Sequence, residues 1–131
     1  PLSLSFRVFM GGRSSRVKGH GYERKIATLF RKFFPNAKRG FQTRGGTAEA
    51  PDVDGTPFYI ECKRQKNNCS LPAALKQAEA GQYVVTDEGT TRRDLRPPVA
   101  ICKNDRERDM VAMYLDDFMK LVERIYGETK Y

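Results

Sequence analysis

The segment from Pro51 to Lys63 constrains the fold more than any other part of the chain. Val53 is expected in a short strand that ends at Asp54-Gly55, a dipeptide typical of tight turns. After the turn, apolar and polar residues alternate in the period-two pattern of a strand: Phe58, Ile60 and Cys62 against Tyr59, Glu61 and Lys63. The segment therefore predicts two neighbouring strands joined by a short turn.

Two acids and a lysine are placed together by these strands. Eight residues separate Asp52 from Glu61, so their carboxylates can lie side by side across the turn. Glu61 and Lys63 are two residues apart and project from the same face. Facing like charges destabilise a sheet, and a hard divalent cation removes that conflict because Mg²⁺ favours carboxylate oxygens. The pattern predicts a metal site, with the backbone carbonyl of Cys62 as an additional ligand.

A third acid stands in an apolar helical stripe. Residues 21–34 have a period of about 100° per residue, which predicts a helix. Its apolar stripe is expected to contain Ile26, Ala27, Phe30, Phe33 and Phe34. Glu23 falls in the middle of this stripe, where a carboxylate is costly unless a cation compensates it. We therefore expect Glu23 to join Asp52 and Glu61 around Mg²⁺ or Mn²⁺.

The charge of the chain indicates a polyanionic partner. The net charge is +8, and three of the four basic segments flank the acidic residues: Arg13–Lys25, Arg31–Arg44 and Lys63–Lys66, with Arg92–Arg96 apart from them. This favours nucleic acid over a merely solvated surface. Hydrolysis of a phosphodiester needs a metal that activates water, and a cation such as Lys63 to stabilise developing charge. No apolar run approaches the roughly 20 residues of a membrane helix, so no membrane partner is expected.

The chain follows the order helix, three strands, helix, two strands, helix, without an internal repeat. The remaining expected elements are a strand at Lys38–Thr43, a helix from the N-cap Ser70 to Ala80, a hairpin of Pro98–Lys103 and Asp109–Leu115, and a last helix capped by Asp116. Thr86–Arg96 is polar and predicts a loop. The last helix is amphipathic, and its apolar side is expected to face inward: Phe118, Leu121, Val122 and Ile125.

With these motifs, residues 18–125 resemble the PD-(D/E)xK nuclease superfamily, and most closely the archaeal-type and phage Holliday junction resolvases. The most specific parts are Gly21-Tyr22-Glu23-Arg24, Pro51-Asp52-Val53 and Glu61-Cys62-Lys63. The resemblance implies an α/β, restriction-endonuclease-like core with a mixed five-stranded sheet flanked by helices (αβββαββα). It also implies Mg²⁺ or Mn²⁺ as cofactor, a homodimer, and catalytic roles for Glu23, Asp52, Glu61 and Lys63.

The resemblance implies two further catalytic positions and supports a DNA-binding surface. Thr47 is the hydroxyl nearest to the functional serine that the resolvases carry before the motif Asp, and Gln77 matches a glutamine that supports the site. The expected DNA-binding residues are Arg13, Arg16, Lys18, His20, Arg24, Arg44, Arg64 and Lys66. We expect residues 1–18 to form an N-terminal extension with a basic arm, and residues 19–131 to form one nuclease domain.

Three functions remain open from the sequence. The first is a structure-selective endonuclease that nicks four-way DNA junctions. The second keeps the chemistry but acts on linear, flapped or single-stranded DNA. The third is a DNA-binding module on a nuclease fold that has lost catalysis, which the complete set of acids and lysine disfavours. Three cysteines without a CxxC pair predict reduced thiols and hence a cytoplasmic protein. The resemblance implies a prokaryotic or phage-infected cell and no small-molecule cofactor.

Overall fold

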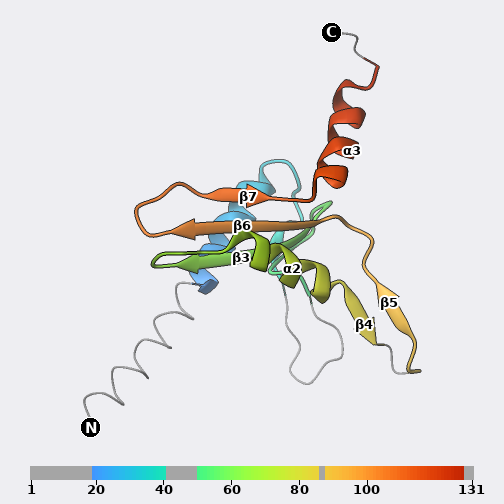
Figure 1. The fold of residues 1–131 in the computed structure, drawn as a ribbon, viewed down its shortest axis with the longest axis horizontal. Helices are drawn as coiled ribbons and strands as arrows, with labels where there is room; N and C mark the ends of the chain where they lie inside the picture. The colour runs from blue at the N-terminus through green and yellow to red at the C-terminus, as the bar shows by residue number, and fades with distance from the viewer. Residues whose placement is uncertain (1–18, 41–49, 86–87, 129–131) are drawn as a thin grey trace.

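The computed structural model describes residues 19–40, 50–85 and 88–128 (Figure 1). An N-terminal helix covers residues 19–31. The strands are β1 (Lys38–Arg39), β2 (Val53–Asp54), β3 (Tyr59–Gln65), β4 (Tyr83–Val85), β5 (Thr91–Arg93), β6 (Pro98–Asn104) and β7 (Met110–Ala112). The other two helices are α2 (Leu71–Gly81) and α3 (Leu115–Tyr126). None of the helices in these three ranges is long and apolar enough to cross a membrane.

Five strands form one mixed sheet in the order β1-β2-β3-β6-β7. β3 and β6 are parallel, and every other neighbouring pair is antiparallel. A parallel pair needs a crossover connection, and here the chain crosses through α2 and a separate hairpin of β4 and β5 (Figure 1). The predicted α/β architecture, a mixed five-stranded sheet flanked by helices, is confirmed.

The sheet has a helix-covered core on each face. The first cluster joins the N-terminal helix to the sheet and comprises Tyr22, Ile26, Ala27, Val53, Ile60, Cys62, Val99 and Ile101. The second joins α2 to the opposite face and comprises Ala74, Leu75, Ala100 and Cys102. Because side chains alternate along a strand, Ile60 and Cys62 face the N-terminal helix, while Glu61 and Lys63 belong to the face of α2. The predicted alternation of β3 thus determines on which face of the sheet its charged side chains lie.

The first helix is shorter at its end than its apolar pattern indicated. The helix ends at residue 31 and a turn follows, so the predicted end at residue 34 was wrong. Phe33 is 77% exposed because it lies beyond the helix and no longer follows the helical period.

The predicted N-cap of α2 is confirmed, since the Ser70 hydroxyl accepts a hydrogen bond from the Ala73 amide at 3.2 Å. In the predicted first strand, residues 38–39 pair, and residues 41–43 lie outside the described ranges.

The loop predicted over Thr86–Arg96 is in part a strand. β5 pairs antiparallel with β4, and Tyr83 lies opposite Arg93. The sequence of β5 has no apolar alternation because the strand is held by main-chain pairing and is exposed along its length. Gly89, with φ of +79°, supplies the left-handed residue between the two strands. Residues 86–87 lie outside the described ranges.

The last helix departs most from expectation. Its N-cap is Tyr114 rather than Asp116. Asp116 and Asp117 lie in the first turn, where their negative charges interact favourably with the positive end of the helix dipole. No residue of α3 is buried, so the prediction that its apolar side faces the core was wrong: Phe118 is 48% and Ile125 67% exposed. Figure 1 shows α3 projecting away from the sheet. The helical period predicted the apolar stripe correctly, but it does not show what covers that stripe.

Candidate active site

Asp52, Glu61 and Lys63 meet at the β2–β3 hairpin. Val53 pairs with Ile60, so Asp52 and Glu61 are neighbours across the two strands. Asp52 is 9% exposed, and its carboxylate accepts a hydrogen bond from the Cys62 amide through Oδ2 at 2.8 Å. Lys63 Nζ lies 3.5 Å from Glu61 Oε1. The hairpin thus brings together the two carboxylates and the lysine that the sequence pattern selects.

The two carboxyl groups of this hairpin are poorly solvated. Burial is the main cause that raises the pKa of Glu61 to about 7, and the negative charge of Asp52 adds to it against the opposing effect of Lys63. Burial and the charge of Glu23 likewise raise the pKa of Asp52, although the Cys62 amide favours its ionised form. Two interacting acids with raised pKa values are frequent at functional sites. They favour either a shared proton or a bound cation.

This arrangement predicts that the metal-free protein loses stability as pH rises from about 4.5 to about 7. In that window Glu61 is ionised in the unfolded chain but retains its proton in the folded one, so its contribution is complete below pH 4.5 and lost above pH 7. Urea unfolding of the wild type and of Glu61→Gln at a series of pH values measures the effect. The free energy of unfolding should fall less with pH in the variant; parallel profiles would contradict the assignment.

Glu23 approaches the cluster from the N-terminal helix and is held by an arginine. Arg39 Nε donates to Glu23 Oε2 at 2.7 Å, and the Glu23 side chain is only 16% exposed. Arg39 belongs to β1 beside β2, where the Gly40 amide donates to the Asp52 carbonyl at 2.8 Å. Glu23 also raises the pKa of Asp52 and of the Cys62 thiol through its charge. The cation that a carboxylate in an apolar stripe requires is therefore Arg39.

The donor set fits a hard divalent cation at Asp52 and Glu61. Both offer carboxylate oxygens, and a cation would offset the burial and the neighbouring negative charge that raise their pKa values. Burial and the surrounding acids raise the pKa of the Cys62 thiol, so its sulfur is a poor ligand and only its carbonyl remains a candidate. Within the described ranges no three acidic, histidine or cysteine side chains are gathered as a metal site. The Glu23 carboxylate is held by Arg39 through Oε2.

The remaining predicted residues are dispersed or lie outside the described ranges. Thr47, Arg13, Arg16, Lys18 and Arg44 all lie outside them. The side chains of His20, Arg24, Lys66 and Gln77 are exposed. Arg64 is paired with Asp105 at 2.6 Å.

Sequence reasoning missed the role of Arg39. It counted this residue only within a basic segment. The signal that could have found Arg39 is the uncompensated charge of Glu23, which requires a cation from a neighbouring element.

Comparison with known protein families gives one match. The family described as phage putative PDDEXK endonuclease matches residues 14–131. Neither curated proteins nor solved structures give a significant match to the chain. The family match includes the β2–β3 hairpin, the N-terminal helix and both later helices, so it covers every part of the site described above.

Proposed function

The chain belongs to this family of phage PDDEXK endonucleases, and on that premise we propose that it is a divalent-metal-dependent DNA endonuclease with Asp52, Glu61 and Lys63 at its catalytic centre. The observation that carries the proposal is the pair of adjacent, poorly solvated carboxyl groups with raised pKa values beside Lys63. An inert surface hairpin has no physical reason to hold two acids in this state. A DNA-binding module without catalysis would not need them.

Each residue of the centre has a distinct role in this proposal. Asp52 and Glu61 would hold Mg²⁺ or Mn²⁺, with Glu23 and the carbonyl of Cys62 as further ligands. The bound metal would lower the pKa of a water molecule and offset negative charge on the phosphate. Lys63 lies on the same face as Glu61, where its ammonium group can orient the attacking water and stabilise the charge that develops on phosphate oxygens.

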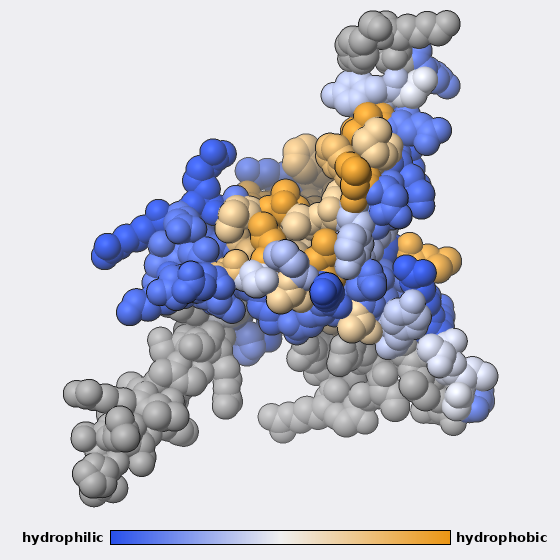
Figure 2. Space-filling model, viewed as in Figure 1, coloured by the Kyte–Doolittle hydropathy of each residue, from blue (hydrophilic) through white to orange (hydrophobic). Residues whose placement is uncertain are grey.

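We further propose that the active unit is a homodimer formed through α3. One side of this helix is an unburied apolar stripe: Leu115, Phe118, Met119, Val122 and Ile125. Figure 2 shows hydrophobic surface continuing from the body of the molecule onto α3. Exposed apolar patches of this kind mark interaction sites. α3 also carries both acids and bases, so a second copy can approach it despite the net charge of +8.

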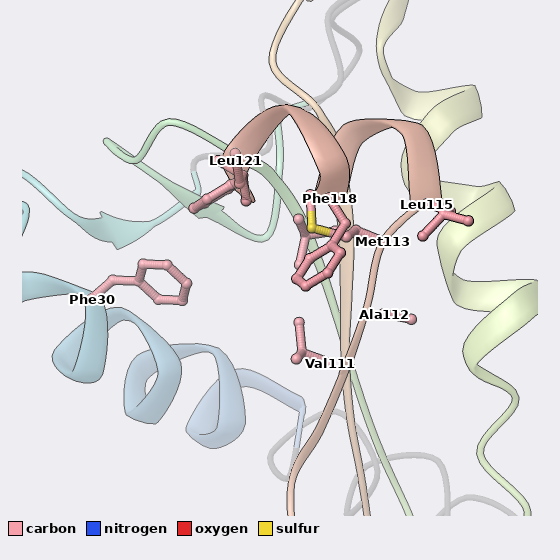
Figure 3. Close-up of a pocket in the computed structure, with 9 residues that line it drawn as sticks. Phe30, Val111, Ala112, Met113, Leu115, Phe118 and Leu121 are labelled. Carbon is pink, nitrogen blue, oxygen red and sulfur yellow. The ribbon is translucent and has the colours of Figure 1, made fainter. Parts of the chain in front are cut away.

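An apolar groove beside α3 continues this surface, and Leu115 and Phe118 belong to both. It has a volume of about 490 Å³ and is lined by apolar side chains only: Phe30, Phe58, Val99, Val111, Ala112, Met113, Leu115, Phe118 and Leu121. Figure 3 shows Phe118 of α3 and Phe30 of the N-terminal helix on opposite sides of this space. A two-fold dimer uses the same patch on both copies, so each stripe can enter the groove of the other copy.

Phe118→Glu is therefore expected to convert a dimer into a monomer. A carboxylate at the centre of an apolar interface costs free energy because it loses its hydration there. Light scattering during size exclusion measures the mass of the wild type and the variant. Phe33→Glu is the matched control, since Phe33 is also exposed but does not line the groove. A monomeric wild type, or a variant that stays dimeric, would contradict the proposed interface.

As substrate we propose the four-way DNA junction, on which a two-fold dimer makes two symmetric nicks. The family description names an endonuclease without a branched substrate, so cleavage of linear, flapped or single-stranded DNA is the alternative. A panel of these four DNA forms, cut under the same Mg²⁺ conditions, distinguishes them. Faster cutting of the junction than of the other forms supports a junction-resolving enzyme. Equal rates on junction and linear duplex would leave only a nuclease without preference for junctions.

The free thiols of Cys62, Cys69 and Cys102 suit the reducing cytosol of a phage-infected cell.

A further inference from the structure

The β4–β5 hairpin is a small basic ribbon outside the catalytic hairpin. β4 and β5 form their own two-stranded sheet, which extends away from the main sheet in Figure 1. The side chains of Thr91, Arg92 and Arg93 are all exposed. The Arg93 guanidinium lies over the Tyr83 ring at 5.7 Å, an arrangement that holds its planar group in place at the surface. The arginine side chains of β5 are therefore exposed to solvent, and β5 has no buried apolar face.

A basic cleft separates this ribbon from α3. It has a volume of about 340 Å³, and its charged lining residues come from the end of the ribbon and from α3: Arg93, Arg96, Asp117, Lys120 and Arg124. Four of these side chains are cationic and one is acidic. Such an excess in a concave surface concentrates positive potential and attracts anions.

The positive charge of Arg96 is not available to a ligand of the cleft, because Arg96 forms ion pairs with two aspartates. Its Nη2 lies 2.7 Å from Asp94 Oδ2, and its Nη1 lies 2.7 Å from Asp54 Oδ1. Asp54 follows the catalytic Asp52 by two residues, so this network ties the base of the ribbon to the catalytic hairpin. The Asp94 amide also donates to the Gln82 carbonyl at 2.8 Å. These contacts connect the base of the ribbon to the β2–β3 hairpin.

With Arg96 neutralised, the cations that remain for a ligand are Arg93, Lys120 and Arg124, against the single carboxylate of Asp117. Among the residues that the structure describes, no ion pair is formed by these three cations. Arginine matches phosphate geometry through two parallel N–H donors, and lysine adds a compact charge. A row of such groups along a cleft is suited to a phosphodiester backbone.

We propose that Arg93, Lys120 and Arg124 form a second DNA-backbone site separate from the catalytic centre. This inference rests on the proposed function in one respect, that the substrate is DNA. The site would grip a part of the duplex that is not being cut. Arg96 connects the base of the ribbon to Asp54, two residues from Asp52.

The test compares DNA binding by two pairs of substitutions in the Asp52→Asn background, which removes cleavage from the measurement. Arg93→Gln with Arg124→Gln removes two cations of the cleft. Arg106→Gln with Arg108→Gln removes two exposed cations of the β6–β7 turn and leaves net charge matched. Fluorescence anisotropy of a labelled linear duplex gives the affinity over a series of salt concentrations. Circular dichroism checks that each variant is folded.

The cleft variant is expected to bind duplex about tenfold more weakly and to lower the salt slope by about 2, one unit for each lost phosphate contact. The turn variant should stay close to the Asp52→Asn parent in both quantities. Equal weakening in both variants, or no weakening in the cleft variant, would overturn the proposal. The result is independent of the proposed catalysis, whose failure would appear as an intact chain that cleaves no DNA in Mg²⁺.

Discussion

Asp52→Asn is expected to lower the rate of DNA cleavage by about 10³-fold or more, a loss of roughly 4 kcal/mol of transition-state stabilisation. The amide keeps the size of the side chain and can still accept the hydrogen bond from the Cys62 amide. It lacks the charge that a divalent cation requires from its ligand. Removing one negative charge beside a phosphate also favours DNA binding, so affinity should be unchanged or higher.

Single-turnover cleavage and DNA affinity are the two measurements for this variant. Glu79→Gln is the charge-matched control, because Glu79 is an exposed acid of α2 outside the proposed catalytic pair. We expect the control to cleave within a few-fold of the wild type. Glu61→Gln should behave like Asp52→Asn. Near-wild-type turnover in either of these two variants would show that the acid concerned is not a metal ligand.

Lys63→Ala is expected to lower turnover by about 10²- to 10³-fold at saturating DNA and metal, the range found when one donor to a developing oxyanion is removed. Lys63 Nζ lies 3.5 Å from Glu61, so its loss also removes the cation that opposes protonation of that acid. The wild-type fold should persist, because the Lys63 side chain is partly exposed.

The control for Lys63 is Lys76→Ala on the exposed side of α2, which should leave turnover unchanged. Circular dichroism and single-turnover rates are measured on both variants. A loss of only about two-fold in Lys63→Ala would assign the lysine to surface solvation rather than to catalysis.

The β2–β3 hairpin was predictable because its information is local. The period of two in β3 decides that Glu61 and Lys63 share a face, and the tight turn at Gly55, with φ of +78°, returns the chain so that Asp52 lies beside Glu61. The helical period of residues 21–34 likewise located Glu23 among apolar side chains, and the structure supplies the compensating cation that this position requires. The mixed sheet and its flanking helices followed from the order of these elements together with the family resemblance.

The parts that sequence reasoning missed depend on partners distant in sequence. β5 has no pattern of its own and is a strand because β4 pairs with it. Arg39 acquires a role only when the sheet brings β1 beside the helix that carries Glu23. α3 has a clear apolar stripe, yet nothing in its sequence distinguishes a stripe that packs on the core from one left open. In all three cases tertiary contacts decide what local periodicity cannot.

The most direct test of the central claim is cleavage of DNA by the wild-type protein with its divalent metal controlled. Junction and linear duplex are incubated with EDTA, then with Mg²⁺, Mn²⁺ or Ca²⁺ restored, and Asp52→Asn is run in parallel. The account predicts cutting with Mg²⁺ or Mn²⁺, none with EDTA, DNA binding without efficient cutting in Ca²⁺, and no cutting by Asp52→Asn. Cutting that persists in EDTA, or intact DNA of every form in Mg²⁺ and Mn²⁺, would contradict it.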